Sequence, residues 1–381
     1  MLMMNKFKKN LVNTKRIIKR KINSLYIHIP FCNKICSYCS FSKMLYFPKI
    51  ARKYICNLIV DLKKVKQNFN KFKTIYIGGG TPSSLSISLL ENLLKYASIL
   101  LLKNGEFTFE ANLDSLTEEK LKILKKYGVN RLSIGIETSS NKYLSLMNRE
   151  YDFDINKKME LVKKYFTNFN LDLIYGLPNE TLLEVKKDLE FILNFKPKHI
   201  SIYALEVNPN SKFYIDGIKE EKDEILRKQY DFVVNFLKKN GYNRYEVSNF
   251  ALKGYKSRHN INYRKDNEYV AIGTSSSGFI DNIRYVNSSS ISDYIKGKRN
   301  KETEIITKTS DKTYYILTNL RLEEGFKLSD YKRKFNEDFY LKKKEVIDDL
   351  VKHNVLIMDK DRIRVAADYI YVLDSIVVKL I

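Results

Sequence analysis

Short apolar runs alternate with amphipathic helical runs from residue 25 to about residue 205, and this order restricts the fold more than any other feature of the chain. The apolar runs are rich in β-branched and aromatic residues, as is typical of strands that are buried on both faces. The expected strands are Leu25–Ile29, Thr74–Ile77, Glu106–Glu110, Arg131–Ile136, Leu171–Tyr175 and His199–Leu205. The expected helices between them are Pro48–Phe69, Ser84–Lys103, Thr117–Tyr127, Asn141–Met147, Asp154–Phe166 and Thr181–Asn194.

Strands and helices that alternate in this way form a parallel sheet with right-handed crossovers. The six units of this chain fall short of the eight that close a (β/α)8 barrel. We therefore expect an α/β fold built on a partial, open (β/α)6 barrel. In such sheets the functional side chains gather beyond the carboxyl ends of the strands.

The alternation stops after Pro209. A long helix is expected at Lys219–Asn240, then short strands over 242–285, a Ser-rich linker at Ser288–Asn300, and a tail of helices that ends in the strands Val355–Met358 and Arg362–Ala366. We expect a basic N-terminal arm over 1–23, the barrel over 24–209, an accessory α+β region over 210–300, and a small helical, winged-helix-like C-terminal domain over 301–381.

The chain is strongly basic, with 68 Lys and Arg against 44 Asp and Glu. Such a charge is compatible with nucleic acid, an anionic membrane surface or a substrate with several carboxylates. The basic residues are spread through helices and loops alike, in a chain rich in Lys, Asn, Ile, Tyr and Phe and without Trp. We therefore expect a solvated charge, no nucleic-acid partner and at most a weak association with a membrane surface.

No apolar run reaches the ~20 residues that a membrane helix needs, so a soluble, cytoplasmic protein is expected. The first 23 residues carry many Lys and Arg and no acid. A solvated arm explains them most simply, and an organellar presequence is the alternative.

Three cysteines lie within eight residues, at Cys32, Cys36 and Cys39. A 4Fe-4S cluster normally takes four cysteine ligands, so three would leave one iron free to bind the amino and carboxylate groups of S-adenosylmethionine (SAM). The alternative is a zinc site with His28 as the fourth ligand. The fourth cysteine, Cys56, is expected on the apolar face of a helix, buried in the hydrophobic core.

Further polar and glycine-rich groups follow the other strands. Gly78–Thr81 directly follows the second expected strand, and consecutive glycines let a backbone approach a ligand closely. Four charged residues fall at or after later strand ends, where they could reach a cofactor's ribose, amino group and carboxylate: Glu110, Glu137, Arg149 and Asp172. All of these groups are expected at one rim of the barrel.

The run from Tyr26 to Phe41 resembles the cluster segment of the radical SAM family that contains the oxygen-independent coproporphyrinogen III oxidases and the haem chaperones of the HemW type. Further matches follow in order at Gly78–Ser83, Glu110–Asn112, Asn130–Gly135, Asp172–Pro178, His199–Tyr203, Tyr245–Ala251 and Asn319–Gly325. The resemblance spans residues 25–280 and extends into the tail.

Within this family the chain is most similar to the haem chaperones. The oxidases have a further Cys two residues after the third cluster Cys, where this chain has Phe41. The chaperones have a His-Asn-x-x-Tyr-Trp haem motif, and this chain has His259, Asn260 and Tyr263 with Arg264 in place of the Trp. The resemblance implies His259 as an axial haem ligand, while Arg264 departs from the pattern and could pair with a propionate.

The resemblance also implies the cofactor sites. Cys32, Cys36 and Cys39 would hold the cluster, and the residues around SAM would be Tyr26, Tyr38, Gly79, Gly80, Thr81, Glu110, Glu137, Arg149 and Asp172. Three of the family's residues are replaced: a Gln by Glu137, an Asp by Ser40, and a His by Tyr151.

The function that the resemblance implies is that of a haem chaperone that transfers haem to an acceptor protein not identified by the sequence. The alternative, from the enzyme class, is oxidative decarboxylation of coproporphyrinogen III in porphyrin biosynthesis, and a radical SAM enzyme acting on tRNA is a weaker third. If SAM is cleaved, an electron donor such as flavodoxin or ferredoxin is expected. No catalytic residue is assigned.

Overall fold

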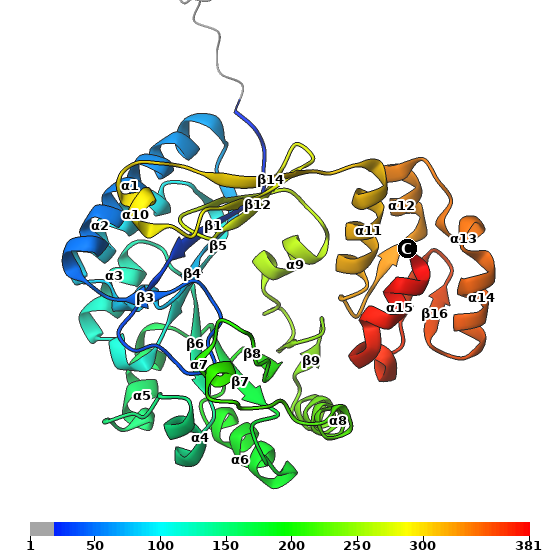
Figure 1. Ribbon diagram of the computed structural model, residues 1–381, viewed down its shortest axis with the longest axis horizontal. Helices are drawn as coiled ribbons and strands as arrows, with labels where there is room; N and C mark the ends of the chain where they lie inside the picture. Colours follow the sequence, from blue (N-terminus) through cyan, green and yellow to red (C-terminus); the bar gives the residue numbers. More distant parts are fainter. Residues whose placement is uncertain (1–18) are drawn as a thin grey trace, which may run out of the picture.

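The computed structural model describes residues 19–381, and the expected parallel sheet forms its centre (Figure 1). Its strands are β1 (Ser24–Ile29), β4 (Phe72–Gly79), β5 (Leu101–Ala111), β6 (Arg131–Glu137), β7 (Phe169–Tyr175) and β8 (His199–Ala204). They lie side by side in chain order, and every neighbouring pair is parallel. The expected α/β fold with a partial (β/α)6 barrel is therefore confirmed.

Helices cover the outer face of this sheet. They are α1 (Pro48–Asn68), α2 (Ile87–Ser98), α3 (Glu118–Lys126), α4 (Asn141–Leu146), α5 (Ile155–Tyr165) and α6 (Leu182–Leu193), with single turns η1 (Pro82–Ser84) and η2 (Leu113–Ser115). The helix expected over Ser84–Lys103 is wrong at its end, because Leu101 already pairs with Phe72 and starts β5. The boundary between α2 and β5 is set by pairing with β4, and the local sequence pattern does not show this pairing.

The accessory strands extend the same sheet instead of forming one of their own. β11 (Tyr269–Ile272) pairs with β1 and continues into β12 (Ser277–Ile280), β13 (Ile283–Asn287) and β14 (Lys301–Ile305). At the opposite edge, β8 is followed by β10 (Asn249–Ala251) and β9 (Asn243–Arg244). The barrel and the accessory region thus share one sheet of 12 strands.

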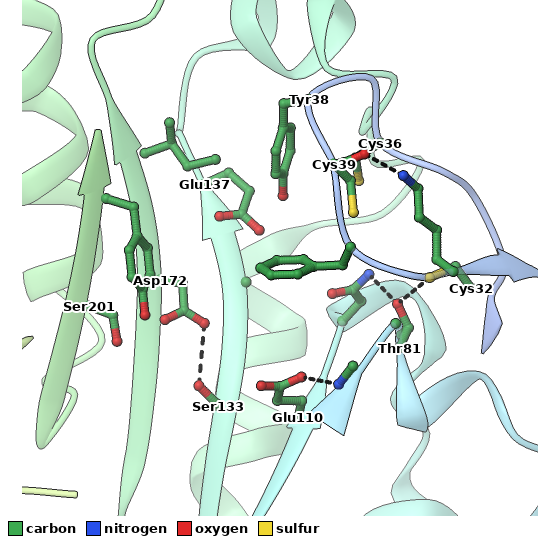
Figure 2. A pocket seen from close by; sticks show the side chains of 18 of the residues that line it. Cys32, Cys36, Tyr38, Cys39, Thr81, Glu110, Ser133, Glu137, Asp172 and Ser201 are labelled. Carbon is green, nitrogen blue, oxygen red and sulfur yellow. Dashed lines mark hydrogen bonds between the residues drawn. The ribbon is translucent and has the colours of Figure 1, made fainter. Parts of the chain in front are cut away.

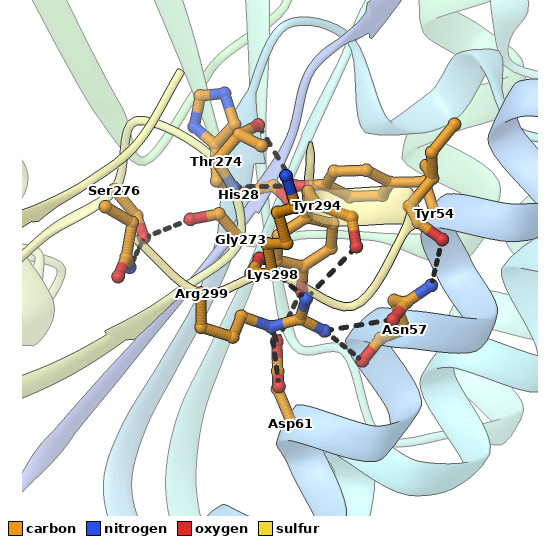
Figure 3. A network of polar contacts seen from close by, with 12 residues as sticks. His28, Tyr54, Asn57, Asp61, Gly273, Thr274, Ser276, Tyr294, Lys298 and Arg299 are labelled. Atoms are coloured by element: carbon orange, nitrogen blue, oxygen red, sulfur yellow. Dashed lines mark hydrogen bonds and ion pairs between the residues drawn. The ribbon is translucent and has the colours of Figure 1, made fainter. Parts of the chain in front are cut away.

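Four helices belong to the accessory region: α7 (Lys212–Ile215), α8 (Asp223–Lys239), α9 (Arg258–Arg264) and α10 (Ile291–Ile295). The expected linker at Ser288–Asn300 is wrong, because it contains α10 and is fixed to α1. The Tyr294 hydroxyl donates to Asp61 at 2.6 Å, and Arg299 Nε donates to the same carboxylate at 2.9 Å (Figure 3). The Ser-rich composition gives no sign of these contacts, because their acceptor, Asp61, lies more than 200 residues earlier in the chain.

The C-terminal region packs around an aromatic core that includes Phe326, Tyr331 and Phe339, all nearly fully buried. An antiparallel sheet of β15 (Phe326–Lys327), β17 (Arg362–Val365) and β16 (Leu356–Asp359) supports the expected winged-helix-like arrangement. Its helices are α11 (Lys308–Asn319), α12 (Leu328–Phe335), α13 (Phe339–Lys342), α14 (Lys344–Lys352) and α15 (Leu373–Leu380), with the turn η3 (Ala367–Val372). The expectation that the two strands end the tail is wrong, because η3 and α15 follow β17.

Two further expectations concern the N-terminal part of the chain. Most of the basic arm over 1–23 lies outside the described residues. Cys56 was expected in the core, but it is exposed on α1. The inward face of α1 carries Tyr54, Ile55, Leu58 and Ile59, whereas Cys56 lies in line with the exposed Arg52 and Val60, four residues away on either side. Within residues 19–381, no helix is both long and apolar enough to cross a membrane.

Candidate functional site

The three clustered cysteines lie in the loop that follows β1. Cys32 ends the short strand β2 (Phe31–Cys32), which pairs with β3 (Met44–Leu45), and the chain between these strands folds over the carboxyl end of the barrel. All three cysteines line one cavity of about 360 Å³ (Figure 2). A ligand in this cavity would contact the cysteine loop and the strand ends together.

Two of the sulfurs receive a hydrogen bond from the barrel. Thr81 Oγ1 donates to Cys32 Sγ at 3.4 Å, and Arg149 Nη1 donates to Cys36 Sγ at 3.4 Å. Burial raises the pKa of the Cys32 thiol to about 11 and also raises the pKa of Cys39. Metal binding must displace the thiol protons, so cluster assembly and thiol ionisation are coupled.

The geometry does not support a zinc site. Nowhere in residues 19–381 do three or more His, Cys, Asp or Glu side chains meet closely enough to hold a single metal ion. His28 faces the Tyr26 hydroxyl through Nδ1 at 3.1 Å and the carbonyl oxygen of Ser42 through Nε2 at 3.2 Å. Burial lowers its pKa to about 4. A 4Fe-4S cluster binds each cysteine through a different iron, so its ligands do not have to converge on one point.

The glycines after β4 leave no room for a side chain. A Cβ on Gly78 would lie 2.6 Å from the Glu110 carboxylate, and one on Gly80 would lie 2.9 Å from Cys32 Sγ. Gly79 has a φ of +121°, and a Cβ there would lie 2.5 Å from the His28 ring. This close approach explains three consecutive glycines, which a simple turn does not need.

Glu110 lies at the end of β5 and faces the cavity. It accepts hydrogen bonds from the Tyr76 hydroxyl at 2.6 Å and from the Gly79 backbone N–H at 2.9 Å. Burial nevertheless raises its pKa to about 7, because desolvation outweighs these two donors. The carboxylate is thus held in a fixed position next to the glycine turn.

Glu137 and Arg149 form a buried pair between β6 and the cysteine loop. Glu137 has a φ of +67°, at a bulge in β6, and its Oε1 lies 3.5 Å from Arg149 Nη2. Arg149 also donates to the Gly135 carbonyl oxygen at 2.7 Å and, through Nε, to the Tyr151 hydroxyl at 3.1 Å. Two of the three replaced family positions, Glu137 and Tyr151, therefore contact the same guanidinium group.

The interior of the barrel below these residues is polar. Ser133 Oγ donates to Asp172 at 3.3 Å, and Asn170 Nδ2 donates to the same carboxylate at 2.7 Å. These side chains alternate with apolar ones along β6 and β7, so they share the inner face. Four polar residues that line the cavity were not predicted, although their alternation with apolar neighbours along the strands could have indicated them: Arg131, Ser133, Asn170 and Ser201.

The residues expected around SAM lie together, with one exception. Tyr38, Gly79, Gly80, Thr81, Glu110, Glu137, Arg149 and Asp172 all line the cavity. Tyr26 is not among the lining residues, since its hydroxyl faces His28 and its ring lies next to Tyr76. Ser40 also lines the cavity. Phe41 lies at its mouth with 68% of its surface exposed.

His259 lies outside the cavity, on α9. Its ring is 1% exposed, with Nδ1 2.8 Å from Thr74 Oγ1 and Nε2 2.7 Å from the Tyr263 hydroxyl. Burial lowers its pKa to about 3. Neither ring nitrogen is free in this arrangement, so binding to a haem iron would require His259 to release either Thr74 or Tyr263.

Arg264 has a partner within the protein. Its Nε donates to Glu246 Oε2 at 2.8 Å, and the Glu246 side chain is completely buried. In this structure Arg264 compensates a buried carboxylate, so it already has a role that does not depend on haem.

Comparisons with known proteins are consistent with this geometry. A family model described as the radical SAM superfamily matches residues 26–192. The haem chaperone HemW of Lactococcus lactis is 37% identical, over 90% of this chain and 93% of that protein. HemW of Bacillus subtilis is 33% identical, over 82% of this chain and 87% of that protein. The solved structure of coproporphyrinogen III oxidase from Escherichia coli, described as a radical SAM enzyme, superposes with a TM-score of 0.82 at 21% identity, over 95% of this chain and 90% of that one. This last likeness concerns the fold alone.

Proposed function

The chain belongs to the haem chaperone HemW family of radical SAM proteins, and from this premise we propose that it carries haem and transfers it to an acceptor protein. The observation that carries the proposal is the convergence of three cysteines, a glycine turn and buried charged groups on one cavity, in a chain similar to haem chaperones over most of its length. Haem is proposed as the cargo because the relatives named above are haem chaperones.

The residues of the cavity fit a 4Fe-4S cluster with SAM. Cys32, Cys36 and Cys39 would hold three irons, and the glycine turn next to Cys32 has no space for any larger residue. The fourth iron, without a cysteine, would bind the amino and carboxylate groups of SAM. Near this iron, Glu110 and Asp172 would provide carboxylates. Glu137 and Arg149 would provide a negative and a positive group that contact each other.

We further propose that the haem acceptor is a protein, with a flavodoxin or ferredoxin as electron donor if SAM is cleaved. Reduced thiols in the cysteine loop support a cytoplasmic location, since such compartments keep thiols reduced. His259 is the candidate axial ligand from sequence, and in that role its ring must first release Thr74 or Tyr263.

Decarboxylation of coproporphyrinogen III is the competing function. Likeness to the oxidase fold is compatible with it, because the same barrel supports different reactions. Phe41 argues against it, since it occupies the position of the oxidases' further cysteine and its side chain lies exposed at the cavity mouth.

Haem titration tests the proposal directly. Protein reconstituted with iron and sulfide under anaerobic conditions should develop a Soret band that saturates with haem. Subsequent mixing with apomyoglobin, as a general acceptor, should transfer the haem and convert the spectrum to that of myoglobin. A protein that takes up no haem, or that never releases it to an acceptor, would contradict the proposal.

A further inference from the structure

One buried cation in the floor of the cavity has no partner. Arg131, the first residue of β6, is 2% exposed and lines the cavity, and its guanidinium group makes no hydrogen bond or ion pair within residues 19–381. Its Nε is buried without an acceptor. The Nε atoms of Arg244 and Arg284 are also buried without an acceptor, but their guanidinium groups bond elsewhere: Arg244 donates to the Tyr230 hydroxyl at 3.2 Å, and Arg284 pairs with Asp266.

Burial raises the pKa of the neighbouring carboxylates Glu110 and Asp172, and their attraction to the Arg131 charge offsets part of this rise, but neither of them bonds to Arg131 directly. Glu110 is held by Tyr76 and Gly79, and Asp172 is held by Ser133 and Asn170. Thr108, which pairs with Arg131 across β5 and β6, also has a buried hydroxyl oxygen without a partner. Buried charged groups are normally paired, so an isolated guanidinium here indicates a missing acceptor.

The missing acceptor is best explained as a carboxylate. A guanidinium group offers two parallel N–H donors that match the two oxygens of a carboxylate. The carboxylate of SAM would be bound at the cysteine loop, at the opposite end of the strands. Arg131 and Glu137 are the first and last residues of β6, roughly 20 Å apart along an extended strand. The carboxylate at the floor must therefore come from a second molecule.

We propose that Arg131 binds a propionate of the tetrapyrrole cargo, in the floor of the same cavity that holds SAM. The proposal rests on the proposed function, because that function supplies a cargo with propionates. It does not require His259 as a ligand, and the iron of the haem takes no part in it.

The test compares protoporphyrin IX with its dimethyl ester, in which both propionates are blocked. Binding of each probe is followed by fluorescence for the wild-type protein, Arg131→Met, and the control Arg258→Met, which removes one exposed positive charge on α9. Wild type should bind the free acid roughly tenfold or more tightly than the ester, and Arg131→Met should lose this preference. Arg258→Met should keep it. Binding of SAM, measured by equilibrium dialysis, should be unchanged in Arg131→Met.

Thermal unfolding of the porphyrin-free protein gives an independent result. Replacing an unpaired buried charge by an apolar side chain should raise the melting temperature of Arg131→Met above that of wild type. An unchanged preference for the free acid in Arg131→Met, or a loss of SAM binding without loss of porphyrin binding, would overturn the inference and leave the haem-carrier function intact. A wild-type protein that binds neither porphyrin nor haem would overturn both.

Discussion

Arg149 Nη1 lies 3.4 Å from the sulfur of Cys36. The same guanidinium group lies 3.5 Å from the Glu137 carboxylate, which occupies the position of an amide in the family pattern. One cation is thus shared between the proposed cluster ligand Cys36 and the Glu137 carboxylate, so we expect a change at Glu137 to alter the electrostatics of a bound cluster.

Glu137→Gln should shift the reduction potential of the cluster to more positive values, by roughly tens of millivolts. The substitution removes a negative charge near the proposed cluster site and leaves Arg149 without its ion-pair partner, while the contact of Arg149 with Cys36 remains. Redox titration followed by electron paramagnetic resonance measures the shift. Glu150→Gln is the matched control, because that carboxylate is exposed and bonded to Ser145. Equal potentials in all three proteins would show that Glu137 does not act on the cluster.

Cluster assembly should depend on Cys36 but not on Cys56. Cys36→Ser should lose the visible iron–sulfur absorbance on reconstitution, since it removes one of the three proposed thiolate ligands. Cys56→Ser removes an exposed thiol on α1 and should keep the full spectrum. Iron and sulfide analysis checks both variants. Retention of the complete cluster by Cys36→Ser would exclude Cys36 as a ligand.

Arg264 should contribute to stability through Glu246. Arg264→Ala leaves a fully buried carboxylate unpaired, and we expect it to lower the free energy of unfolding by about 2–3 kcal/mol, less than for a pair buried on both sides. Combining it with Glu246→Gln should recover part of the loss. Lys265→Ala breaks an exposed pair with Glu324 and should cost less than about 1 kcal/mol. Urea denaturation curves that coincide for Arg264→Ala and Lys265→Ala would contradict this account.

Glu110 should make stability depend on pH. Its pKa is about 7 in the folded protein against 4.5 for an ordinary Glu, so the folded state holds the proton more tightly than the unfolded state does. The resulting contribution to the free energy of unfolding is fully present below about pH 4.5 and is lost as the pH rises through about 7. It amounts to at most about 3 kcal/mol. The free energy of unfolding of wild type should therefore fall relative to Glu110→Gln between about pH 5 and 8. If urea denaturation gives the same pH dependence of stability for wild type and Glu110→Gln, the pKa of Glu110 is not raised in the folded protein.

The sequence was sufficient for features that depend on local pattern. All six barrel strands and the start of α1 follow from periodicity, and the parallel order follows from their alternation with helices. The cysteine loop and most of the residues around it follow from motifs at strand ends.

Other features depend on partners far away in the chain and could not be predicted. Arg299 binds Asp61 across more than 200 residues, so a segment that looks like a linker is in fact fixed. His259 lies on a helix against β4, where Thr74 and Tyr263 occupy its ring nitrogens. Arg131 looked like the ordinary start of a strand, and only the inward direction of its side chain places it in the cavity.

The central claim, that this protein carries a tetrapyrrole and does not decarboxylate one, is tested most directly by anaerobic turnover. The reconstituted protein is incubated with SAM, a reductant and coproporphyrinogen III, and the porphyrin products are separated by chromatography after oxidation. The account predicts coproporphyrin only, at every time point. Accumulation of protoporphyrin in proportion to enzyme concentration would contradict it.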